Sequence, residues 1–300
     1  MNDFPVYACE YSRKLANASK RFALQVYDPP EGLGAPSISE TDEKLGPDPF
    51  GELSRDGSLP KGLVRRFTDR VLIMTAEQCF MACRHCTRRG ILGKAEIVRT
   101  DEELFACRQY VADNPEIRDV LLSGGDILTL NDERVMRFVD AFTSLEQIDI
   151  VRVCTRAPCT NPARITPELA KALGSSGKVW VNTQFNCADE VTPEASNAAK
   201  LLVEAGIPVS CQTVLLKGVN DSTDEMLKLF RALGRARIRP YYVFVCDPVS
   251  GTERFRVDAA TACRIERECA EAIGGLSMPR FVADLPNAKR KTPVSELCTT

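Results

Sequence analysis

Val71-Leu72-Ile73-Met74-Thr75 leads, three residues later, into Cys79-Phe80-Met81-Ala82-Cys83-Arg84-His85-Cys86. The first run is apolar and rich in β-branched residues, which is typical of a strand buried on both faces. The second run, residues 79–86, is called the cysteine loop below. Its spacing, C-x3-C-x2-C, would arise by chance about 0.02 times in a chain of this cysteine content. The stretch therefore predicts a buried strand that ends in a metal-binding loop.

Three thiolates are one fewer than a 4Fe-4S cluster normally takes. If Cys79, Cys83 and Cys86 hold such a cluster, one iron keeps an open position where a small chelating molecule can bind, as in catalytic metal sites. The alternative is a Cys3His zinc knuckle that uses His85, the only histidine of the chain. It is disfavoured because His85 and Cys86 are neighbours and would have to converge on one small ion. The spacing therefore favours a reactive iron-sulfur cluster.

The composition sets further bounds on the class of protein. With 300 residues, 44% hydrophobic and 27% charged, the chain has the balance of a soluble globular protein with one sizeable core. A formal net charge of -2 gives no strong field for a polyanion, so nucleic acid is not an expected partner. The sequence has no apolar stretch of membrane-span or signal-peptide character, so we expect a cytoplasmic protein without membrane contact. Most of the ten other cysteines are expected to be reduced core thiols.

Beyond the first strand the chain alternates regularly between two patterns. Apolar, β-branched runs predict six strands at 71–75, 120–123, 148–154, 179–183, 209–216 and 241–245. Helical patterns, several of them opened by Thr, Asp or Pro, lie between and after them at 101–112, 132–142, 167–173, 193–205, 223–233 and 259–273. Six β-α units in a row predict an α/β fold with a parallel sheet, which right-handed crossovers curl into a partial (β/α)6 TIM-like barrel.

The ends of the chain have a different character. Helical spacing of apolar residues predicts one amphipathic helix over residues 8–26. Residues 28–60 hold six prolines and five glycines, which predicts an irregular wrapping segment. We therefore expect an N-terminal helix and wrapping segment at 1–60, the barrel at 61–275 and a C-terminal segment at 276–300.

Polar residues follow the predicted strands, where the chemistry of such barrels is located. The cysteine loop follows the first strand, and later strands are followed or ended by Gly124-Gly125-Asp126, Arg156, Gln184 and Asn186, Gln212, and Asp247. Arginines gather at the same mouth in two sets, residues 65, 66 and 70 and residues 84, 88 and 89. Guanidinium groups suit phosphate and carboxylate ligands, so we expect both sets to converge on the site.

The cysteine spacing resembles that of the radical S-adenosylmethionine (SAM) enzymes. The run Cys83-Arg84-His85-Cys86-Thr87-Arg88-Arg89 is similar to one branch of them, the lysine 2,3-aminomutases. The resemblance implies a barrel of the radical SAM type and an isomerase. In that family SAM chelates the open iron, and an electron from the cluster releases a 5'-deoxyadenosyl radical. The implied reaction moves the α-amino group of L-lysine, or a close cationic analogue, to the β-carbon.

The resemblance also implies roles for single residues. Ser123, Gly124, Gly125, Asp126 and Gln184 match SAM-binding positions, although the family usually has histidine where this chain has Gln184. Arg66, Arg70 and Gln212 match positions that bind pyridoxal 5'-phosphate (PLP). Arg88 matches the residue that holds the substrate α-carboxylate, and Asp247 and Asp284 match the pair that holds the lysine ε-ammonium. Glutamate-specific relatives do not keep this acidic pair, so its presence favours a cationic side chain.

The lysine that binds PLP covalently is matched by Lys291, which precedes Thr292-Pro293-Val294. Lys289 is the competitor, and the family's glycine-rich run before this lysine is absent. Neighbouring cations would help to lower the pKa of the reactive amine. A solvated basic tail is the simpler alternative for this segment.

The implied partners are an amino-acid substrate, an electron donor such as flavodoxin or ferredoxin, and a second copy of the chain in a homo-oligomer. Three alternatives remain open at this point. The same chemistry can act on arginine or glutamate, or on a lysyl residue of a protein such as a translation factor. A non-enzymatic iron-sulfur or zinc-binding protein is the rival from another class.

Overall fold

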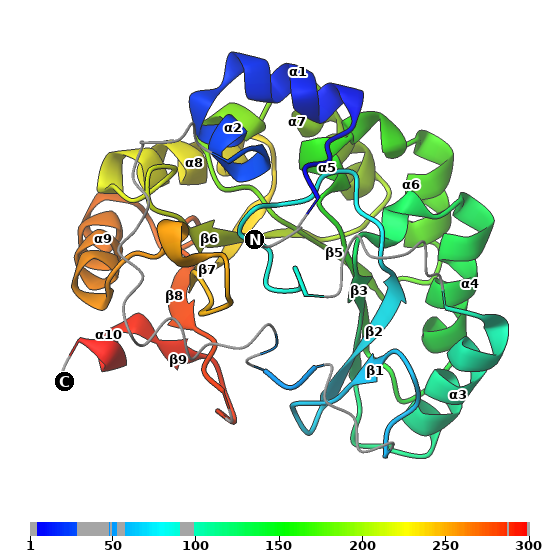
Figure 1. Ribbon diagram of the computed structural model, residues 1–300. Coiled ribbons are helices and arrows are strands. Elements are labelled where there is room, and N and C mark those ends of the chain that lie inside the picture. Colours follow the sequence, from blue (N-terminus) through cyan, green and yellow to red (C-terminus); the bar gives the residue numbers. More distant parts are fainter. Residues whose placement is uncertain are drawn as a thin grey trace.

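The computed structural model describes residues 5–28, 48, 50–52, 58–90, 99–286 and 288–298. Its centre is a curved sheet of nine strands in the order β1 to β9 (Figure 1). Seven of them run parallel: β2 (Arg70–Ala76), β3 (Asp119–Gly124), β4 (Ile150–Cys154), β5 (Val179–Thr183), β6 (Val209–Leu215), β7 (Arg239–Val245) and β8 (Arg280–Ala283). Two-residue antiparallel strands, β1 (Leu63–Val64) and β9 (Thr292–Pro293), form the edges, so among the described residues the sheet does not close. The predicted α/β partial barrel is confirmed.

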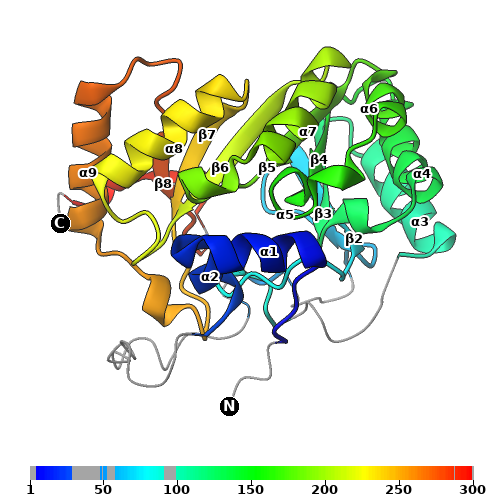
Figure 2. The same cartoon turned by 90° about the horizontal axis from the view of Figure 1, so that it is seen from above.

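Helices cover the outer face of this sheet (Figure 2). The longer ones after the cysteine loop are α3 (Asp101–Ala112), α4 (Asp132–Thr143), α6 (Pro167–Gly174), α7 (Pro193–Glu204), α8 (Thr223–Arg235) and α9 (Ala259–Ala272). Each begins after a residue whose side chain accepts a hydrogen bond from the first turn: Thr100, Asn131, Thr166, Thr192, Ser222 and Asp258. Such caps satisfy backbone donors that the helix cannot pair itself. Two four-residue helices, α5 (Ala157–Thr160) and α10 (Val294–Leu297), complete the set after the loop.

Strand β8 was not predicted. It has four residues and lies beside β7, with Phe281 paired to Val243. The run is too short to be distinguished from a loop by periodicity, and its strand conformation depends on the neighbouring edge of the sheet. Its position matters for the site, because Asp284 now follows a strand as Asp247 does.

The prediction of one helix over residues 8–26 is wrong. The segment forms two helices, α1 (Glu10–Ala18) and α2 (Lys20–Val26), separated by Ser19 in an extended conformation. The Ser19 hydroxyl accepts a hydrogen bond from Phe22 N at 3.2 Å and donates one to Asp189 at 2.6 Å. Serine is a good N-cap residue, so the chain starts a new helix where a continuous one would leave that hydroxyl unused.

The N-terminal segment holds the cysteine loop through backbone contacts. Ala8 forms an antiparallel bridge with Met81, and Arg84 N donates to Gln25 O at 2.8 Å. Helix α1 lies at the rim of the barrel beside α5 (Figure 1), where Ser12 Oγ donates to Thr160 O at 2.7 Å. Helix α2 is joined to α8 by an ion pair between Arg21 and Glu225. Most of the predicted wrapping segment, 28–60, lies outside the described residues.

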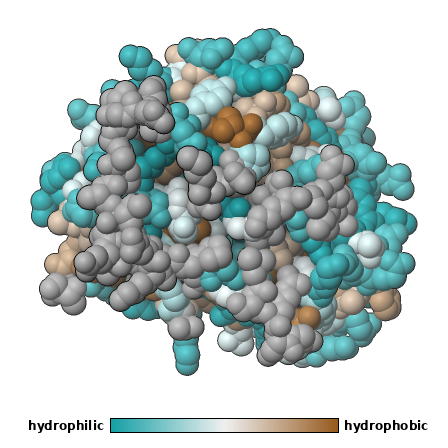
Figure 3. Space-filling view, viewed as in Figure 1, coloured by the Kyte–Doolittle hydropathy of each residue, from teal (hydrophilic) through white to brown (hydrophobic). Residues whose placement is uncertain are grey.

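The core lies between the sheet and its helices. Six of the ten cysteines outside the loop are buried thiols, as predicted: Cys107, Cys159, Cys187, Cys211, Cys246 and Cys269. Cys9 and Cys154 are half-buried free thiols, and Cys263 of α9 and Cys298 form a disulfide, because α10 packs against α9 and brings the two side chains together. No helix in the described part of the chain has the length and apolarity to cross a membrane. The visible rim of the molecule is largely hydrophilic, with apolar surface in separate small patches (Figure 3).

Candidate active site

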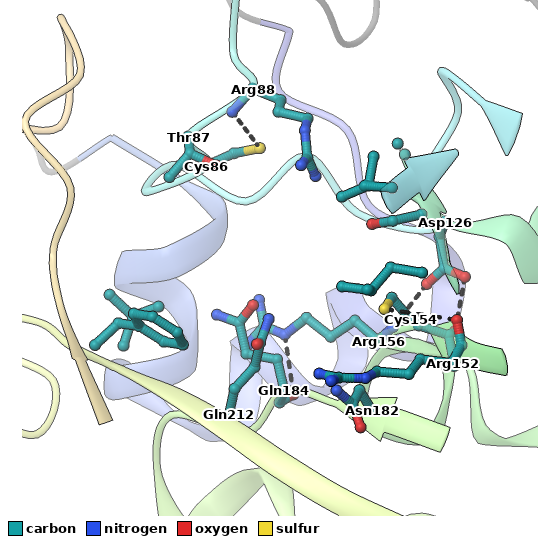
Figure 4. A pocket seen from close by; sticks show the side chains of 18 of the residues that line it. Cys86, Thr87, Arg88, Asp126, Arg152, Cys154, Arg156, Asn182, Gln184 and Gln212 are labelled. Atoms are coloured by element: carbon teal, nitrogen blue, oxygen red, sulfur yellow. Dashed lines mark hydrogen bonds between the residues drawn. The ribbon is translucent and has the colours of Figure 1, made fainter. Parts of the chain in front are cut away.

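A cavity of about 390 Å³ opens where the parallel strands end. It is lined by every residue to which the sequence assigned a role: Arg66, Arg70, Cys79, Cys83, Cys86, Arg88, Ser123, Gly124, Gly125, Asp126, Gln184, Gln212, Asp247, Asp284 and Lys291. These residues span more than 200 positions of the chain, and only the fold brings them together. In Figure 4, Arg88 enters the cavity from the segment that follows Cys86, and Arg156 extends along the opposite wall toward Gln184.

The three cysteines reach this cavity from one loop, and two of their sulfur atoms accept N–H donors. The backbone N of Arg88 lies 3.3 Å from Cys86 Sγ, and Arg156 Nη1 lies 3.0 Å from Cys83 Sγ. Burial raises the pKa of the Cys79 thiol, and it raises that of Cys86 to about 12. Such thiols ionise when a metal centre binds them, and N–H donors then stabilise the sulfur ligands. The residues therefore fit a three-thiolate cluster.

His85 is not arranged as a fourth metal ligand. Its Nε2 atom lies 2.9 Å from Gln184 Nε2 and 3.3 Å from Asn186 Nδ2, and its ring packs edge-on against Phe255. Burial lowers the pKa of His85 well below its usual range, so the ring is neutral. Among the described residues no three His, Cys, Asp or Glu side chains are placed to hold a single metal ion. The zinc-knuckle alternative therefore has no support in this geometry.

Gly124 and Gly125 are required by the protein's own backbone. Gly124 has a φ of +108°, and a Cβ there would lie 2.6 Å from Ala76 O. A Cβ at Gly125 would lie 2.1 Å from Gln78 O, and Gly125 N donates to Ala76 O at 2.7 Å. The glycines let the end of β3 lie directly against the chain that leads into the cysteine loop. Any larger residue would push these two parts of the site apart.

The carboxylate of Asp126 ties the ends of β3 and β4 together. It accepts hydrogen bonds from Thr155 Oγ1 at 2.6 Å, Arg156 N at 2.8 Å and Leu128 N at 3.0 Å. Burial raises its pKa although all three donors favour the ionised form. Asp126 therefore lines the cavity as a residue that fixes two loops.

Arg88 carries a partner that sequence reasoning missed. Glu52 binds it bidentately, with Nε–Oε2 and Nη2–Oε1 distances of 2.7 and 3.1 Å. Their side chains are only 17% and 14% exposed. Burial disfavours the charged guanidinium, but the charge of Glu52 outweighs it and raises the pKa of Arg88. Glu52 thus makes the contact that an incoming carboxylate would make, and no motif in its proline- and glycine-rich surroundings marked it.

A second set of charges surrounds Asp284. Arg66 binds both of its oxygens at 3.0 Å, and Lys291 Nζ forms an ion pair with Oδ2. Burial opposes ionisation of Asp284, but the hydrogen bond from Arg66 and the charge of Lys291 lower its pKa. The ammonium of Lys291 lies 5.5 and 5.3 Å from the ring centroids of Phe67 and Phe244, so it is held in a largely apolar frame.

Lys289 lies outside the cavity, whereas Lys291 and Arg70 line it. Lys289 is exposed and is absent from the lining of the cavity, whereas Lys291 faces into it. Arg70 lines the cavity with its guanidinium 3.9 Å from the centroid of the Phe67 ring. Gln212 reaches the cavity from β6.

Asp247 differs from the neighbouring charged residues, because one of its carboxylate oxygens is not paired within the described ranges. Its Oδ1 atom is buried and has no hydrogen-bond partner among the residues that the structure describes. Burial, and next the nearby charge of Asp284, raise the pKa of Asp247 to about 7. A buried carboxylate in this state is costly unless a cationic ligand joins it.

The expectation that both arginine sets converge on the site is wrong in part. Arg65 turns away to Glu116 at 2.5 Å, Arg84 binds Asp28, and Arg89 donates to the backbone of Arg84. Each of these three guanidinium groups finds acceptors outside the cavity. Two other arginines line the cavity: Arg156, which was expected at a strand end, and Arg152, which was not expected.

The model of the radical SAM superfamily matches residues 73–230, about half of the chain. The L-lysine 2,3-aminomutase of Fusobacterium nucleatum is 40% identical over 247 residues, 82% of this chain and 58% of that protein. The glutamate 2,3-aminomutase of Clostridioides difficile is 34% identical over 271 residues, 90% of this chain and 64% of that protein. The chain thus spans about three fifths of the length of these relatives.

Among solved structures, Streptococcus suis SuiB bound to S-adenosylmethionine has a similar fold, with a TM-score of 0.56 and 15% identity. The likeness covers 73% of this chain and 51% of SuiB. Radical SAM enzymes use a 4Fe-4S cluster and SAM, and the cysteine loop and cavity described above fit that requirement. The sequence match, the open barrel and the site together show that the chain belongs to the radical SAM superfamily and, within it, to the family of lysine and glutamate 2,3-aminomutases.

Proposed function

We propose that this chain moves the α-amino group of L-lysine, or of a close cationic analogue, to the β-carbon, with a 4Fe-4S cluster, SAM and PLP as cofactors. One observation carries the choice of substrate. The buried Oδ1 of Asp247 has no hydrogen-bond partner in the described part of the chain, and Asp247 lines the cavity that the three cysteines, Asp284 and Lys291 also line.

The charges of this wall favour an ammonium over a carboxylate. An ammonium ligand would supply the missing hydrogen-bond donor to Asp247 and offset the cost of burying its charge. A glutamate side chain would instead bring a third carboxylate next to Asp247 and Asp284, which is repulsive in a desolvated site. The acidic pair therefore supports lysine over glutamate, and arginine is the nearest competitor.

The cofactors have separate places in this proposal. Cys79, Cys83 and Cys86 hold the cluster. SAM lies beside residues 123–126 and Gln184, and PLP is attached to Lys291 with Arg66, Arg70 and Gln212 around it. When bound, the cluster and SAM supply hydrogen-atom abstraction, and PLP supplies delocalisation of an unpaired electron.

The chain's own residues bind the substrate, orient it and exclude water from the site. Arg88 binds the substrate α-carboxylate once Glu52 has left it, because both carboxylates need the same two N–H donors. Asp247 and Asp284 bind the ε-ammonium. Phe67 and Phe244 flank Lys291 and keep water from its amine.

The proposal includes three further points, an electron donor, a compartment and an assembly, and the first two follow from the chemistry. Reductive cleavage of SAM needs a one-electron donor, and a flavodoxin or ferredoxin is of the right class. Thiolate ligands and low-potential chemistry suit the cytoplasm. A homo-oligomer is included as an assembly to be tested by light scattering.

The proposal is tested by anaerobic reconstitution with iron, sulfide, PLP, SAM and dithionite, followed by incubation with L-lysine, L-arginine or L-glutamate. Mass spectrometry after derivatisation then scores β-amino isomers. The proposal expects β-lysine as the main product and loss of it in Lys291→Ala but not in Lys289→Ala. Isomerisation of glutamate alone would overturn the substrate assignment.

A further inference from the structure

Arg156 contacts Cys83, one of the three cysteines of the loop, and each nitrogen of its guanidinium group donates a hydrogen bond. It follows β4 and is only 9% exposed. Its Nη1 atom donates to Cys83 Sγ at 3.0 Å, and its Nε atom donates to Gln184 O at 3.3 Å. Its Nη2 atom donates to Gln25 Oε1 at 2.7 Å and to Glu190 Oε2 at 3.2 Å. Each nitrogen of the planar fork is therefore used, and its orientation toward the sulfur is fixed.

The anchor of this guanidinium is Glu190, which is fully buried. Glu190 also accepts hydrogen bonds from Gln25 Nε2 at 2.6 Å and from Asn186 N at 2.9 Å. The thiols of Cys159 and Cys187 donate to it at 3.2 and 3.4 Å, and burial raises the pKa of both thiols so that they keep their protons. These donors fix the carboxylate of Glu190 in one position, and Glu190 in turn fixes the guanidinium of Arg156.

The contact to sulfur distinguishes Arg156 from the other arginines in the cavity. The guanidinium of Arg88 is bound by Glu52, and that of Arg152 is bound by Asp119 with an Nε–Oδ1 distance of 3.0 Å. Among the described arginines that line the cavity, Arg156 alone has a guanidinium hydrogen bond to a cysteine sulfur. Its charge is thus placed at the edge of the site where the cluster is held.

We infer that Arg156 is a positioning residue that donates a charged N–H···S bond to the Cys83 ligand and raises the reduction potential of the cluster. Reduction adds one electron from a low-potential donor and makes the cluster more negative. A fixed cation beside a ligand sulfur stabilises that reduced form more than the oxidised one. Arg156 also links the cluster to α2 through its hydrogen bond to Gln25, so α2 contributes to the same property.

The test is an EPR-monitored redox titration of the reconstituted full chain with dithionite, without SAM, PLP or amino acid. Arg156→Gln is expected to move the midpoint to a more negative potential. Arg156→Lys keeps the charge but loses the fork, so its midpoint should lie between the two. Arg152→Gln is the matched control, because it removes a cavity guanidinium that does not contact sulfur, and its shift should be clearly smaller.

The inference is overturned if Arg156→Gln has the wild-type midpoint or shifts it no more than Arg152→Gln does. If Arg156→Gln does not retain a full complement of iron and sulfide, Arg156→Lys decides, and a midpoint at or above the wild-type value contradicts the inference. The inference rests on the cluster of the proposed function but not on its substrate. A wild-type chain that holds a cluster and isomerises a different amino acid leaves this test intact.

Discussion

The two walls of the cavity are built on opposite principles. On the wall formed by the ends of β3, β4 and β5, the charged groups have fixed partners, as Arg156, Glu190 and Asp126 show, although the neutral Thr183 Oγ1 has no partner among the described residues. On the wall formed by the ends of β7 and β8 and by Glu52, charges neutralise each other provisionally, and Asp247 keeps an unpartnered oxygen among the described residues.

The difference indicates that the wall at β3, β4 and β5 is structural and that the wall at β7, β8 and Glu52 binds the ligands. A network in which each charged group is hydrogen-bonded to a fixed partner is rigid and holds a cofactor in one geometry. Exchangeable ion pairs and a desolvated carboxylate lower the stability of the ligand-free protein, and binding of a ligand of opposite charge offsets this cost. Substitutions on the two walls should therefore have different signatures.

The largest effect is expected at the cysteine loop. Cys83→Ser removes a thiolate that the cluster cannot replace, so iron content and formation of 5'-deoxyadenosine from SAM should fall to background. Covalent attachment of PLP, measured after borohydride reduction, should remain. Cys154→Ser is the control, since this thiol lines the cavity outside the loop. Loss of PLP attachment together with the cluster would contradict the independence of the two walls.

Asp247→Asn should weaken lysine binding by roughly 100-fold, because a buried charge-assisted hydrogen bond contributes about 3 kcal/mol. Isothermal titration of the PLP-loaded chain measures this constant. Affinity of the wild type should also rise as the pH increases through about 7, where Asp247 ionises. An unchanged affinity in the variant would place the ε-ammonium elsewhere.

The same substitution should stabilise the ligand-free chain at high pH. Because the fold raises the pKa of Asp247 from 3.8 to about 7, its contribution to stability is complete below pH 4 and is lost as the pH rises through 7. Asp247→Asn should therefore raise the free energy of unfolding at pH 8 by about 4 kcal/mol and have little effect at pH 4. Urea unfolding at both pH values measures this free energy. Asp149→Asn is the control, because the side chain of Asp149 is 59% exposed. A variant less stable than wild type at pH 8 would show that Asp247 is paired in solution.

The smallest effect is expected at Glu52. Glu52→Gln removes the charge that competes with the substrate carboxylate for Arg88, so lysine affinity should increase roughly five-fold, equivalent to about 1 kcal/mol. Glu116→Gln is the matched control, because its partner Arg65 lies outside the cavity. Weaker lysine binding in Glu52→Gln would mean that Glu52 helps to hold the site open for substrate.

The sequence predicted the scaffold well because each β-α unit carries its own local signals. Runs such as 120–123 and 179–183 combine apolar β-branched residues with a following capped helix, and these signals agree. Strand β8 and the break at Ser19 were missed, since one depends on a neighbouring strand and the other on a single hydroxyl. Local patterns cannot show either feature.

The candidate site could be predicted as a set of residues but not as a set of contacts. Family-like motifs located the cysteines and Lys291, and the fold placed them around one cavity. The pairs Arg88–Glu52 and Arg156–Glu190 join residues 36 and 34 positions apart and follow no motif. Such long-range charge pairing depends on tertiary geometry, which is why the sequence did not reveal it.

The central claim is that a PLP-bearing lysine and a three-cysteine cluster share one cavity. Borohydride reduction of the chain loaded with PLP, iron and sulfide, followed by peptide mass spectrometry, tests it most directly. We predict a phosphopyridoxyl label on Lys291 in protein that also carries four irons per chain, the content of one 4Fe-4S cluster. A label on Lys289 or on another lysine, or a chain that binds PLP and the cluster only in separate preparations, would contradict the account.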